Sequence, residues 1–170
     1  LAFFILITLG CRSTKRLQKG QALVTKLEVK GVNNKFAEQA TEYVPADVRP
    51  NSRFNLWLYH SFSKKGKKKI GEAPHILDSS LVELSRNQIE QFLKIKGYLN
   101  AKVKDSITIK NRKASVIFYA NPGTEFKFRN ITINVADSAV KKIYLANRKY
   151  FTRIDSGQRY DTDSIAYERE

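Results

Sequence analysis

The stretch "LKIKGYLNAKV", Leu93 to Val103, joins the end of a helix to the beginning of a strand. Upstream, Ser80-x-x-Glu83 has the spacing of a capping box, and apolar residues then recur near helical spacing. Those residues are Val82, Ile89, Phe92 and Leu93. Gly97 stands where a left-handed residue ends a helix, and Tyr98 stands where its ring can fold back onto the last turn. The pattern predicts a helix over about 79–96.

Downstream of Gly97 the chain alternates with the period of a strand. In "AKVKDSITIK", residues 101–110, the side chains of Ala101, Val103, Ile107 and Ile109 share one face, opposite lysines and hydroxyls. "NRK" at 111–113 turns the chain, and "ASVIFYA" at 114–120 returns with its apolar residues on one face. The pattern predicts a β-hairpin with one face buried and the other in water.

The preceding elements complete a module. "ALVTKLEVKG" predicts a strand with Leu23, Thr25, Leu27 and Val29 on one face, and "NNKFAEQATEYV" at 33–44 predicts a helix. Residues 23–121 therefore have the order β-α-α-β-β, with an insertion at about 46–75. In the insertion, Phe54, Trp57, Leu58 and Phe62 form one side of a short helix. We expect Trp57, Tyr59 and their neighbours to pack the insertion onto the module; the alternative is that they are interfacial anchors.

A second series of predicted elements begins after "NPG" at 121–123. "FKFRNITIN" at 126–134 predicts a strand, "SAVKKIYLAN" a helix with Val140, Ile143 and Tyr144 inward, and "YDTDSIAYERE" the beginning of another helix. A shift of 83 residues aligns Asp78 with Asp161 and also matches three later positions. We interpret residues 122–170 as an incomplete second module.

The single cysteine, Cys11, excludes a disulfide framework. It follows ten uncharged residues, the length of a signal h-region, and "TLGC" places a small residue directly before it. The junction resembles a bacterial lipoprotein signal, with residues 1–10 the signal remnant, Cys11 the lipidated residue and 11–22 a tether. Thr8 departs from the usual leucine. The alternatives are a clipped ordinary signal peptide or a buried strand with an unreactive cysteine.

The net charge of +15 indicates anionic partners without choosing among nucleic acid, phospholipid headgroups and acidic proteins. The densest cluster, Lys64, Lys65, Lys67, Lys68 and Lys69, is either a solvated loop or a contact with anionic headgroups. His60 and His75 have no metal-ligand spacing, and no phosphate loop, catalytic triad or paired carboxylates occur. We therefore predict no enzyme, no cofactor and no metal site.

Together these segments resemble the POTRA domains of the BamA/TamA family of outer-membrane barrel proteins. The resemblance rests on three stretches: "LVELSRNQIEQFLKIKGYLNAKV", "KASVIFYANPGTEFKFRNITI" and "RFNLWLYHSFSKKGKKKIGEAP". The last is similar to an insertion of the lipoprotein branch, the TamL-like proteins, and Cys11 agrees with that branch. The resemblance implies an α+β fold of tandem β-α-α-β-β modules, each a three-stranded mixed sheet covered by two helices, the second one truncated.

The resemblance also implies a site. In POTRA domains the second strand lies at an open sheet edge, here at Ala101, Val103, Asp105, Ile107 and Ile109. Such an edge pairs with an extended segment through main-chain groups. The alternative is that Lys102, Lys104, Asp105 and Lys110 only protect the edge from aggregation.

The implied function is a periplasmic scaffold or docking region of a lipid-anchored outer-membrane protein. Its expected partners are nascent outer-membrane proteins, periplasmic or inner-membrane assembly partners, and the outer membrane through the lipid and a C-terminal barrel beyond residue 170. One alternative is a basic nucleic-acid-binding domain. The lysines argue against it, because no exposed aromatic residues are interleaved with them. Another is a free-standing envelope lipoprotein.

Overall fold

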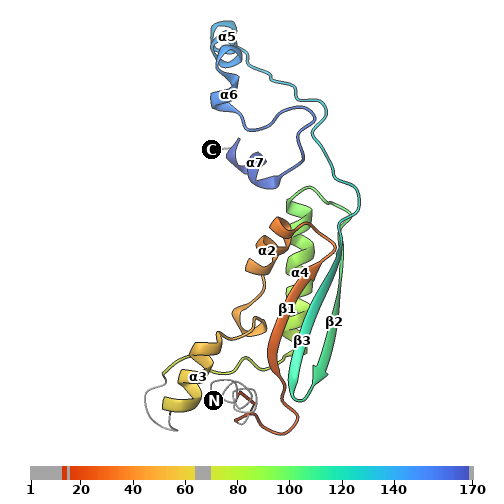
Figure 1. Ribbon diagram of the computed structural model, residues 1–170. Helices are drawn as coiled ribbons and strands as arrows, with labels where there is room; N and C mark the ends of the chain where they lie inside the picture. The colour runs from red at the N-terminus through yellow and green to blue at the C-terminus, as the bar shows by residue number, and fades with distance from the viewer. Residues whose placement is uncertain (1–12, 15, 64–69, 169–170) are drawn as a thin grey trace, which may run out of the picture. The chain divides into compact units, whose positions relative to one another are not determined.

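The computed structural model describes residues 13, 14, 16–63 and 70–168. The chain divides into two compact units, which are described separately (Figure 1). Unit 1 contains the described residues up to Ile89 together with Val103–Ala120, and unit 2 contains Glu90–Lys102 and the residues from Asn121 onward.

A three-stranded mixed sheet forms the centre of unit 1. Its strands are β1 (Leu23–Lys30), β2 (Lys102–Lys110) and β3 (Lys113–Asn121), in the order β1-β3-β2, and β1 runs parallel to β3. The two-residue turn between β2 and β3 has positive φ at Asn111 (51°) and Arg112 (60°), the geometry of a type I′ hairpin turn. This confirms the predicted hairpin.

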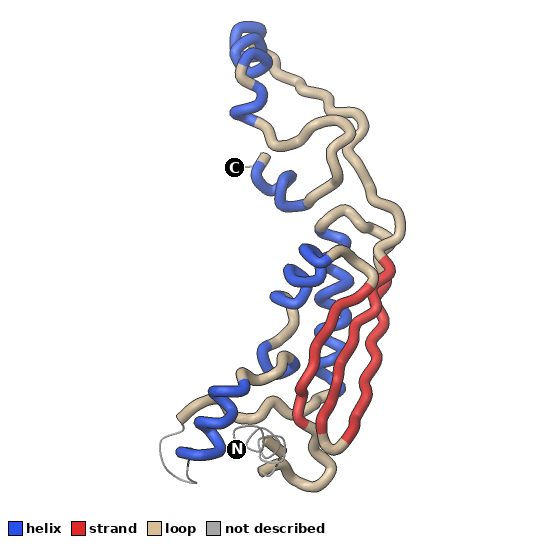
Figure 2. The backbone as a smooth tube through the Cα atoms, in the orientation of Figure 1, coloured by secondary structure: helices blue, strands red, loops and turns tan. Residues whose placement is uncertain are grey.

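Two helices cover one face of this sheet: α2 (Asn34–Glu42) and α4 (Ser79–Ile95), of which Ser79–Ile89 belongs to unit 1 (Figures 1 and 2). The core between the layers is mainly apolar, and its least exposed apolar side chains are Val24, Ala40, Val44, Val82, Ile89, Ala114, Val116 and Phe118. The predicted α+β fold, a β-α-α-β-β module with two helices on a mixed sheet, is confirmed.

The predicted inward face of β1 is wrong at its beginning. A β-bulge shifts the register between Val24 and Lys26, so that Val24 pairs with Ala114 and Leu27 with Val116. Residue 25 is the extra residue, and a bulge reverses which side chains face the core. Val24 is therefore buried at 1% exposure whereas Thr25 is exposed.

Helix α4 begins at a different cap from the one predicted. The carboxylate of Asp78 accepts hydrogen bonds from the backbone N–H groups of Ser80 (2.8 Å) and Leu81 (3.4 Å). Ser80 thus lies inside the first turn and cannot be its N-cap. An aspartate performs the same function, because its carboxylate satisfies the free N–H groups of the first turn and suits the positive end of the helix dipole.

The insertion contains the 3₁₀ turn η2 (Ala46–Val48) and helix α3 (Arg53–Phe62). The chain then returns past the beginning of β1. There, Val24 N–H donates to the His75 carbonyl (2.9 Å) and Leu77 N–H donates to the Ala22 carbonyl (2.8 Å). The insertion is thereby bound to one end of the sheet.

Unit 2 contains the end of α4, α5 (Ser138–Ala146), α6 (Arg148–Phe151) and α7 (Thr162–Tyr167). The helix expected at 138–147 and the helix beginning near 161 are present. The strand expected over 126–134 is wrong: only a short antiparallel contact forms, with a bridge between Lys127 and Arg159. A strand requires a neighbour for its backbone groups. Among the described residues, Gly97 and residues 157–160 bond to the backbone of Phe126 and Phe128, and no such bond is made beyond Phe128 in this segment.

The side chains expected to face inward from α5 lie in solvent. Val140 is 54% and Ile143 is 61% exposed, and no residue of α5 is buried. Tyr144 stacks instead on Phe151 of α6, with ring centroids 5.9 Å apart. The apolar spacing predicted the helix correctly, but no sheet lies beneath it in the described part of the chain.

Candidate functional site

The open edge of the sheet is on β2. The type I′ turn pairs the carbonyl of Lys110 with the N–H of Lys113, and hydrogen-bonded positions alternate along an antiparallel strand. Even-numbered residues of β2 therefore bond to β3, and odd-numbered residues direct their N–H and C=O groups outward. In the described part of the chain, no backbone hydrogen bond outside the sheet is made by Asp105, Ile107 or Ile109. These three residues present an unpaired main-chain edge to solvent.

Two of the five residues expected at this edge lie differently. Ala101 precedes β2, and its N–H donates to the Tyr98 carbonyl at 2.9 Å, so it belongs to the turn after α4. Ile109 was expected to be inward but is 57% exposed, near the hairpin end of the strand. Val103 is buried at 6% exposure and Ile107 is half-buried, as the alternation predicts.

A charged cluster connects β2 to α4. The Arg86 guanidinium lies 3.3 Å from the Asp105 carboxylate and 2.9 Å from that of Glu83. All three groups are partly exposed, and such a network orients its members more than it stabilises them. Lys104 on the opposite face is exposed. The edge thus carries charge on both sides while its backbone groups face solvent.

The other edge strand, β1, is less accessible. Its first residues are bridged by the returning insertion, with Leu23 opposite Ile76, and the bulge interrupts the next residues. Beyond the bulge, the Glu28 carboxylate lies 2.7 Å from the Lys26 ammonium, whose hydrogen bond lowers the pKa of Glu28. Bulges and paired charges are features that discourage strand addition. Of the two edges, β2 is the better template.

Gly97 and Tyr98 form the predicted helix end. Gly97 has φ +93°, its N–H donates to the Lys94 carbonyl (3.1 Å), and Tyr98 N–H donates to the Leu93 carbonyl (3.0 Å). These two bonds define a Schellman motif. A Cβ atom on Gly97 would lie 2.3 Å from the carbonyl oxygen of Tyr160, so the backbone also requires glycine sterically.

A half-buried ion cluster adjoins this turn within unit 2. Lys96 Nζ lies 2.6 Å from Asp163 Oδ2 and 3.2 Å from Asp161 Oδ2, and its side chain is 16% exposed. Burial disfavours the ammonium, but hydrogen bonds to Asp163 and Asp161 outweigh it and raise the pKa of Lys96. The sequence pattern did not indicate this cluster, because its members lie 65 and 67 residues apart along the chain.

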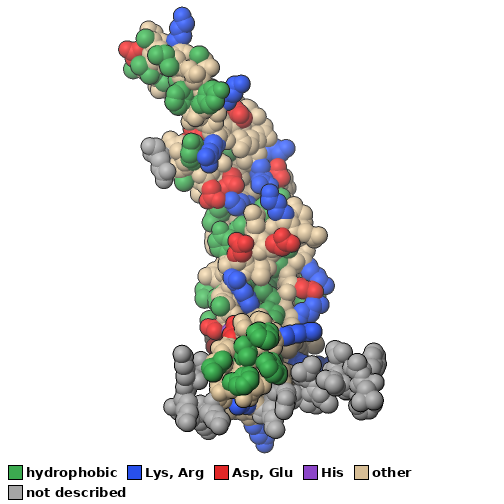
Figure 3. All heavy atoms as spheres, turned by 60° about the vertical axis from the view of Figure 1, so that its left-hand side comes forward, with side chains coloured by type: hydrophobic (Ala, Val, Ile, Leu, Met, Phe, Trp, Pro, Cys, Tyr) green, Lys and Arg blue, Asp and Glu red, His purple; other side chains and the backbone are tan. Residues whose placement is uncertain are grey.

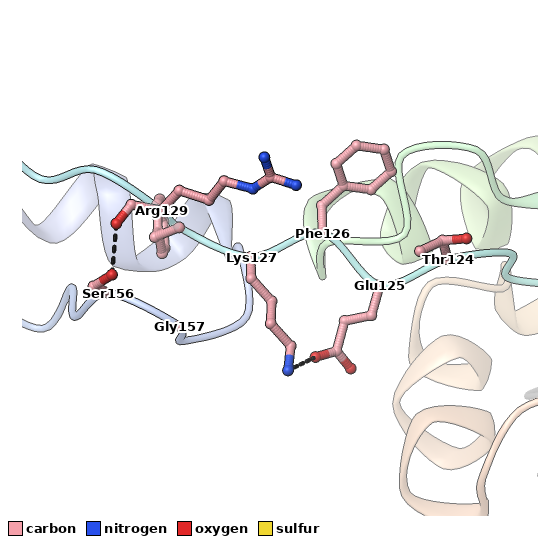
Figure 4. A pocket seen from close by; sticks show the side chains of 8 residues that line it. Thr124, Glu125, Phe126, Lys127, Arg129, Ser156 and Gly157 are labelled. Carbon is pink, nitrogen blue, oxygen red and sulfur yellow. Dashed lines mark hydrogen bonds and ion pairs between the residues drawn. The ribbon is translucent and has the colours of Figure 1, made fainter.

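Unit 2 also contains an open groove of about 620 Å³. It is lined by residues 124–129 with Ser156 and Gly157 (Figure 4). Lys127 points toward Glu125, 4.0 Å away, and the Ser156 hydroxyl donates to the Arg129 carbonyl at 2.5 Å. The described residues that line the groove place neither a nucleophile beside a base nor converging carboxylates in it.

Two predicted sites, Cys11 and the lysine cluster Lys64–Lys69, lie outside the described residues. His75 is half-buried, with Nδ1 2.7 Å from the Arg49 carbonyl oxygen and Nε2 3.2 Å from Glu72. Among the described residues, no group of three His, Cys, Asp or Glu side chains is arranged to hold a metal ion. Within the same residues, no helix has the length and apolarity needed to cross a bilayer.

Arg16 and Leu17 were not identified from the sequence as structural residues. Leu17 is buried at 8% exposure against Leu23 and Leu56, within the stretch expected to be a tether. The Arg112 guanidinium donates to the carbonyls of Leu17 (2.6 Å) and Gln18 (2.7 Å). The single apolar side chain in "RSTKRLQKGQ" was the available signal for this contact.

No family model and no curated protein sequence matches the chain. Among solved structures, the chain is similar to the crystal structure of Haemophilus influenzae BamA POTRA3-5, at 10% identity and a TM-score of 0.44. The similarity covers 86% of this chain and 48% of that one. The chain thus spans about half the length of the structure it is similar to.

Proposed function

We propose that this chain is a periplasmic docking region of an outer-membrane lipoprotein involved in outer-membrane protein assembly or translocation. In this proposal β2 receives extended segments of nascent outer-membrane proteins or of assembly partners by strand addition. The observation that carries it is the outward-facing backbone of Asp105, Ile107 and Ile109 at an edge that no other described segment covers. The β-α-α-β-β order and the POTRA-like sequence pattern support the same function.

The physical basis is main-chain complementarity. An extended client offers alternating N–H and C=O groups, and an open edge pairs with them largely independently of the client's side chains. This suits a protein that handles many different strands. Lysine side chains on the wet face reduce pairing between identical copies through charge repulsion, whereas a neutral or acidic client strand is not repelled.

The test uses one position with two substitutions. Asp105→Pro removes an outward N–H while leaving the bonds to β3, and proline is tolerated on edge strands in this orientation. Asp105→Ala loses the same ion pair with Arg86 but keeps the N–H. The probe is a synthetic peptide with the alternating sequence of an outer-membrane β-strand and a photo-crosslinking residue. We expect Asp105→Pro to lower crosslinking to β2 about fivefold or more and Asp105→Ala to leave it nearly unchanged.

Equal crosslinking for the two variants would reject strand addition at β2 and leave edge protection as the role of its charges. Lys104→Pro is unsuitable for this comparison, because Lys104 directs its N–H toward β3 and proline there would damage the sheet itself.

The proposal places the chain at the periplasmic face of the outer membrane, anchored by lipid on Cys11. The lysine cluster Lys64–Lys69 then contributes attraction to anionic headgroups, about 1 kcal/mol per lysine near the surface. The test is metabolic labelling with a fatty acid. We expect the chain to incorporate the label and Cys11→Ala not to; absence of label from the unsubstituted chain would reject the anchor.

A further inference from the structure

Helix α3 presents its apolar side to solvent. Phe54, Trp57 and Phe62, here called the aromatic stripe, are 64%, 39% and 55% exposed. With Leu58 between them they occupy positions i, i+3, i+4 and i+8, which is one face of an α-helix. We expected Trp57, Tyr59 and their neighbours to pack the insertion onto the module, and for Phe54, Trp57 and Phe62 that expectation is wrong. Tyr59 is half-buried, with the Arg16 guanidinium 5.7 Å from its ring centroid.

The opposite face of α3 packs against other parts of unit 1. Leu56 is buried at 7% exposure in a cluster with Leu17 and Leu23. His60 Nε2 lies 3.1 Å from the Ser13 carbonyl oxygen. The Arg16 guanidinium donates to the carbonyls of Tyr59, His60 and Ser63, at 3.3, 3.0 and 2.9 Å. These contacts determine the rotation of the helix and keep the aromatic stripe outward.

The stripe is a continuous apolar surface. The Phe54 and Trp57 rings stack at a centroid distance of 6.1 Å, and Trp57 meets Phe62 edge-to-face at 5.8 Å. Figure 3 shows hydrophobic side chains gathered over α3. Large aromatic side chains in solvent are costly to leave uncovered, and a contiguous patch of them marks an interaction surface.

The charge around α3 is positive. The helix has no acidic residue, Arg53 at its beginning is exposed, and the chain continues after Ser63 with five lysines at 64–69. Glu72 lies at the beginning of α3, where its carboxylate accepts from the N–H of the N-cap residue Ser52 (3.3 Å) and lies 3.2 Å from His75. A cationic helix with an aromatic face is typical of segments that lie in the headgroup region of an anionic bilayer.

The place of α3 in the chain also indicates a membrane surface. Ser13, which contacts His60, is two residues after Cys11. Two residues span at most about 7 Å, so a lipid on Cys11 would keep the bilayer within reach of α3. This step rests on the proposed lipid anchor, whereas the exposed stripe and the positive charge do not.

We propose that α3 binds an anionic phospholipid surface with the aromatic stripe of Phe54, Trp57 and Phe62 inserted at headgroup depth. The ten-residue helix lies along the surface. Contact on this side orients unit 1 relative to the membrane and leaves the opposite face of α3 bound to Ser13, Arg16 and Leu17.

Trp57 provides a direct reporter because it is the single tryptophan of the chain. The full chain is mixed with vesicles of phosphatidylglycerol and phosphatidylcholine, or of phosphatidylcholine alone. On the anionic vesicles we expect a blue shift of Trp57 emission, quenching by lipids brominated near the headgroup, and acrylamide quenching reduced about threefold or more. Acrylamide quenching that stays at its value in buffer, with the chain bound to the vesicles, would overturn the proposal.

The positions to substitute are chosen by the exposed fraction of their aromatic side chains. Phe54→Ser combined with Phe62→Ser removes two exposed rings without opening the core, and Trp57 should then remain accessible to acrylamide on anionic vesicles. The matched control is Tyr150→Ser, which removes a 77% exposed ring from unit 2 and should leave Trp57 protected. Equal protection of Trp57 in all three proteins would contradict insertion through the stripe.

The same measurement on Cys11→Ala separates this inference from the proposed anchor. Protection of Trp57 in Cys11→Ala, with no fatty acid incorporated by the unsubstituted chain, supports the α3 contact and rejects the anchor. Lipid incorporation with Trp57 exposed on the membrane rejects the α3 contact and leaves the anchor intact.

Discussion

The guanidinium of Arg16 donates a 2.9 Å hydrogen bond to the carbonyl oxygen of Ser63, across 47 residues of chain. It also bonds to two further carbonyls at the end of α3. A helix leaves its last carbonyls without intrahelical partners, and a cation there meets the negative end of the helix dipole. Arg16, from the basic stretch after Cys11, therefore holds α3 in place.

Arg16→Met should loosen α3 without affecting the sheet. We expect a loss of about 1 kcal/mol in the free energy of opening α3, because the guanidinium no longer donates to these carbonyls. Hydrogen exchange of the amides of residues 56–62 measures this opening. Lys19→Met, at an exposed position in the same stretch, is the matched control and should leave these rates unchanged. Equal rates in the two variants would contradict the capping role.

Acid should weaken the attachment of α3 through His60. Burial lowers the pKa of His60 below its usual 6.5, and the nearby Arg16 charge acts in the same direction, outweighing the hydrogen bond to Ser13. A histidine with a lowered pKa stabilises the folded state above pH 6.5, and this contribution disappears as the pH falls through the folded-state pKa. Exchange of α3 amides should therefore accelerate as the pH falls below 6.5, beyond the intrinsic pH effect on exchange.

His60→Gln keeps a hydrogen-bond donor for the Ser13 carbonyl but does not titrate. Its α3 amides should lose the extra pH dependence. If the pH dependence of exchange persists in His60→Gln, another group is responsible.

Gly97→Ala should destabilise the chain more than Gly157→Ala does. Both glycines have left-handed φ values, +93° and +81°, so alanine is strained at each by about 1 kcal/mol. Only at Gly97 does the new Cβ meet an obstacle, the Tyr160 carbonyl oxygen at 2.3 Å; around Gly157 nothing lies within 4 Å. Urea unfolding should show the larger loss for Gly97→Ala, and a larger one still for Gly97→Val. Equal losses at the two glycines would show that the Tyr160 contact relaxes freely.

Alkali should open the cluster around Lys96. Its pKa is raised above the usual 10.5, since the hydrogen bonds to Asp163 and Asp161 outweigh burial. The stability contributed by a raised lysine pKa is complete below pH 10.5 and is lost as the pH rises through the folded-state value. Side-chain carbon NMR shifts of Lys96 across pH 9–12 measure this titration directly. A midpoint at or below 10.5 would contradict the ion cluster.

Lys96→Met removes the ammonium and leaves the Asp161 and Asp163 carboxylates without this cation. We expect a loss of about 1–2 kcal/mol in the free energy of unfolding at neutral pH, because a hydrogen bond between charged groups is removed. Lys127→Met is the control, since Lys127 is 56% exposed and lies 4.0 Å from its carboxylate partner. Similar losses for the two variants would count against a structural role for Lys96.

The 83-residue alignment predicted a helix cap correctly and a strand wrongly. Asp78 and Asp161, aligned by the 83-residue shift, both cap helices: each carboxylate accepts from the N–H two residues further on, at 2.8 and 2.9 Å. The strand predicted at 126–134 in the second copy failed, although its alternation is as clear as that of β2. Capping depends on neighbours in the chain, whereas a strand depends on a partner elsewhere.

The sequence by itself determined the order of elements in unit 1, the hairpin at Asn111 and the left-handed helix end at Gly97. Each of these depends on contacts within a few residues, so periodicity and turn chemistry are sufficient. Only the tertiary structure decided that β1 bulges before Lys26, that Ala101 lies outside the β2 edge, and that α3 turns its aromatic side to solvent. The rotation of α3 depends on Arg16 and Leu17, which reach it from about 40 residues away. Helical spacing shows that a helix has an apolar side, and packing from distant residues decides whether that side faces the core or the water.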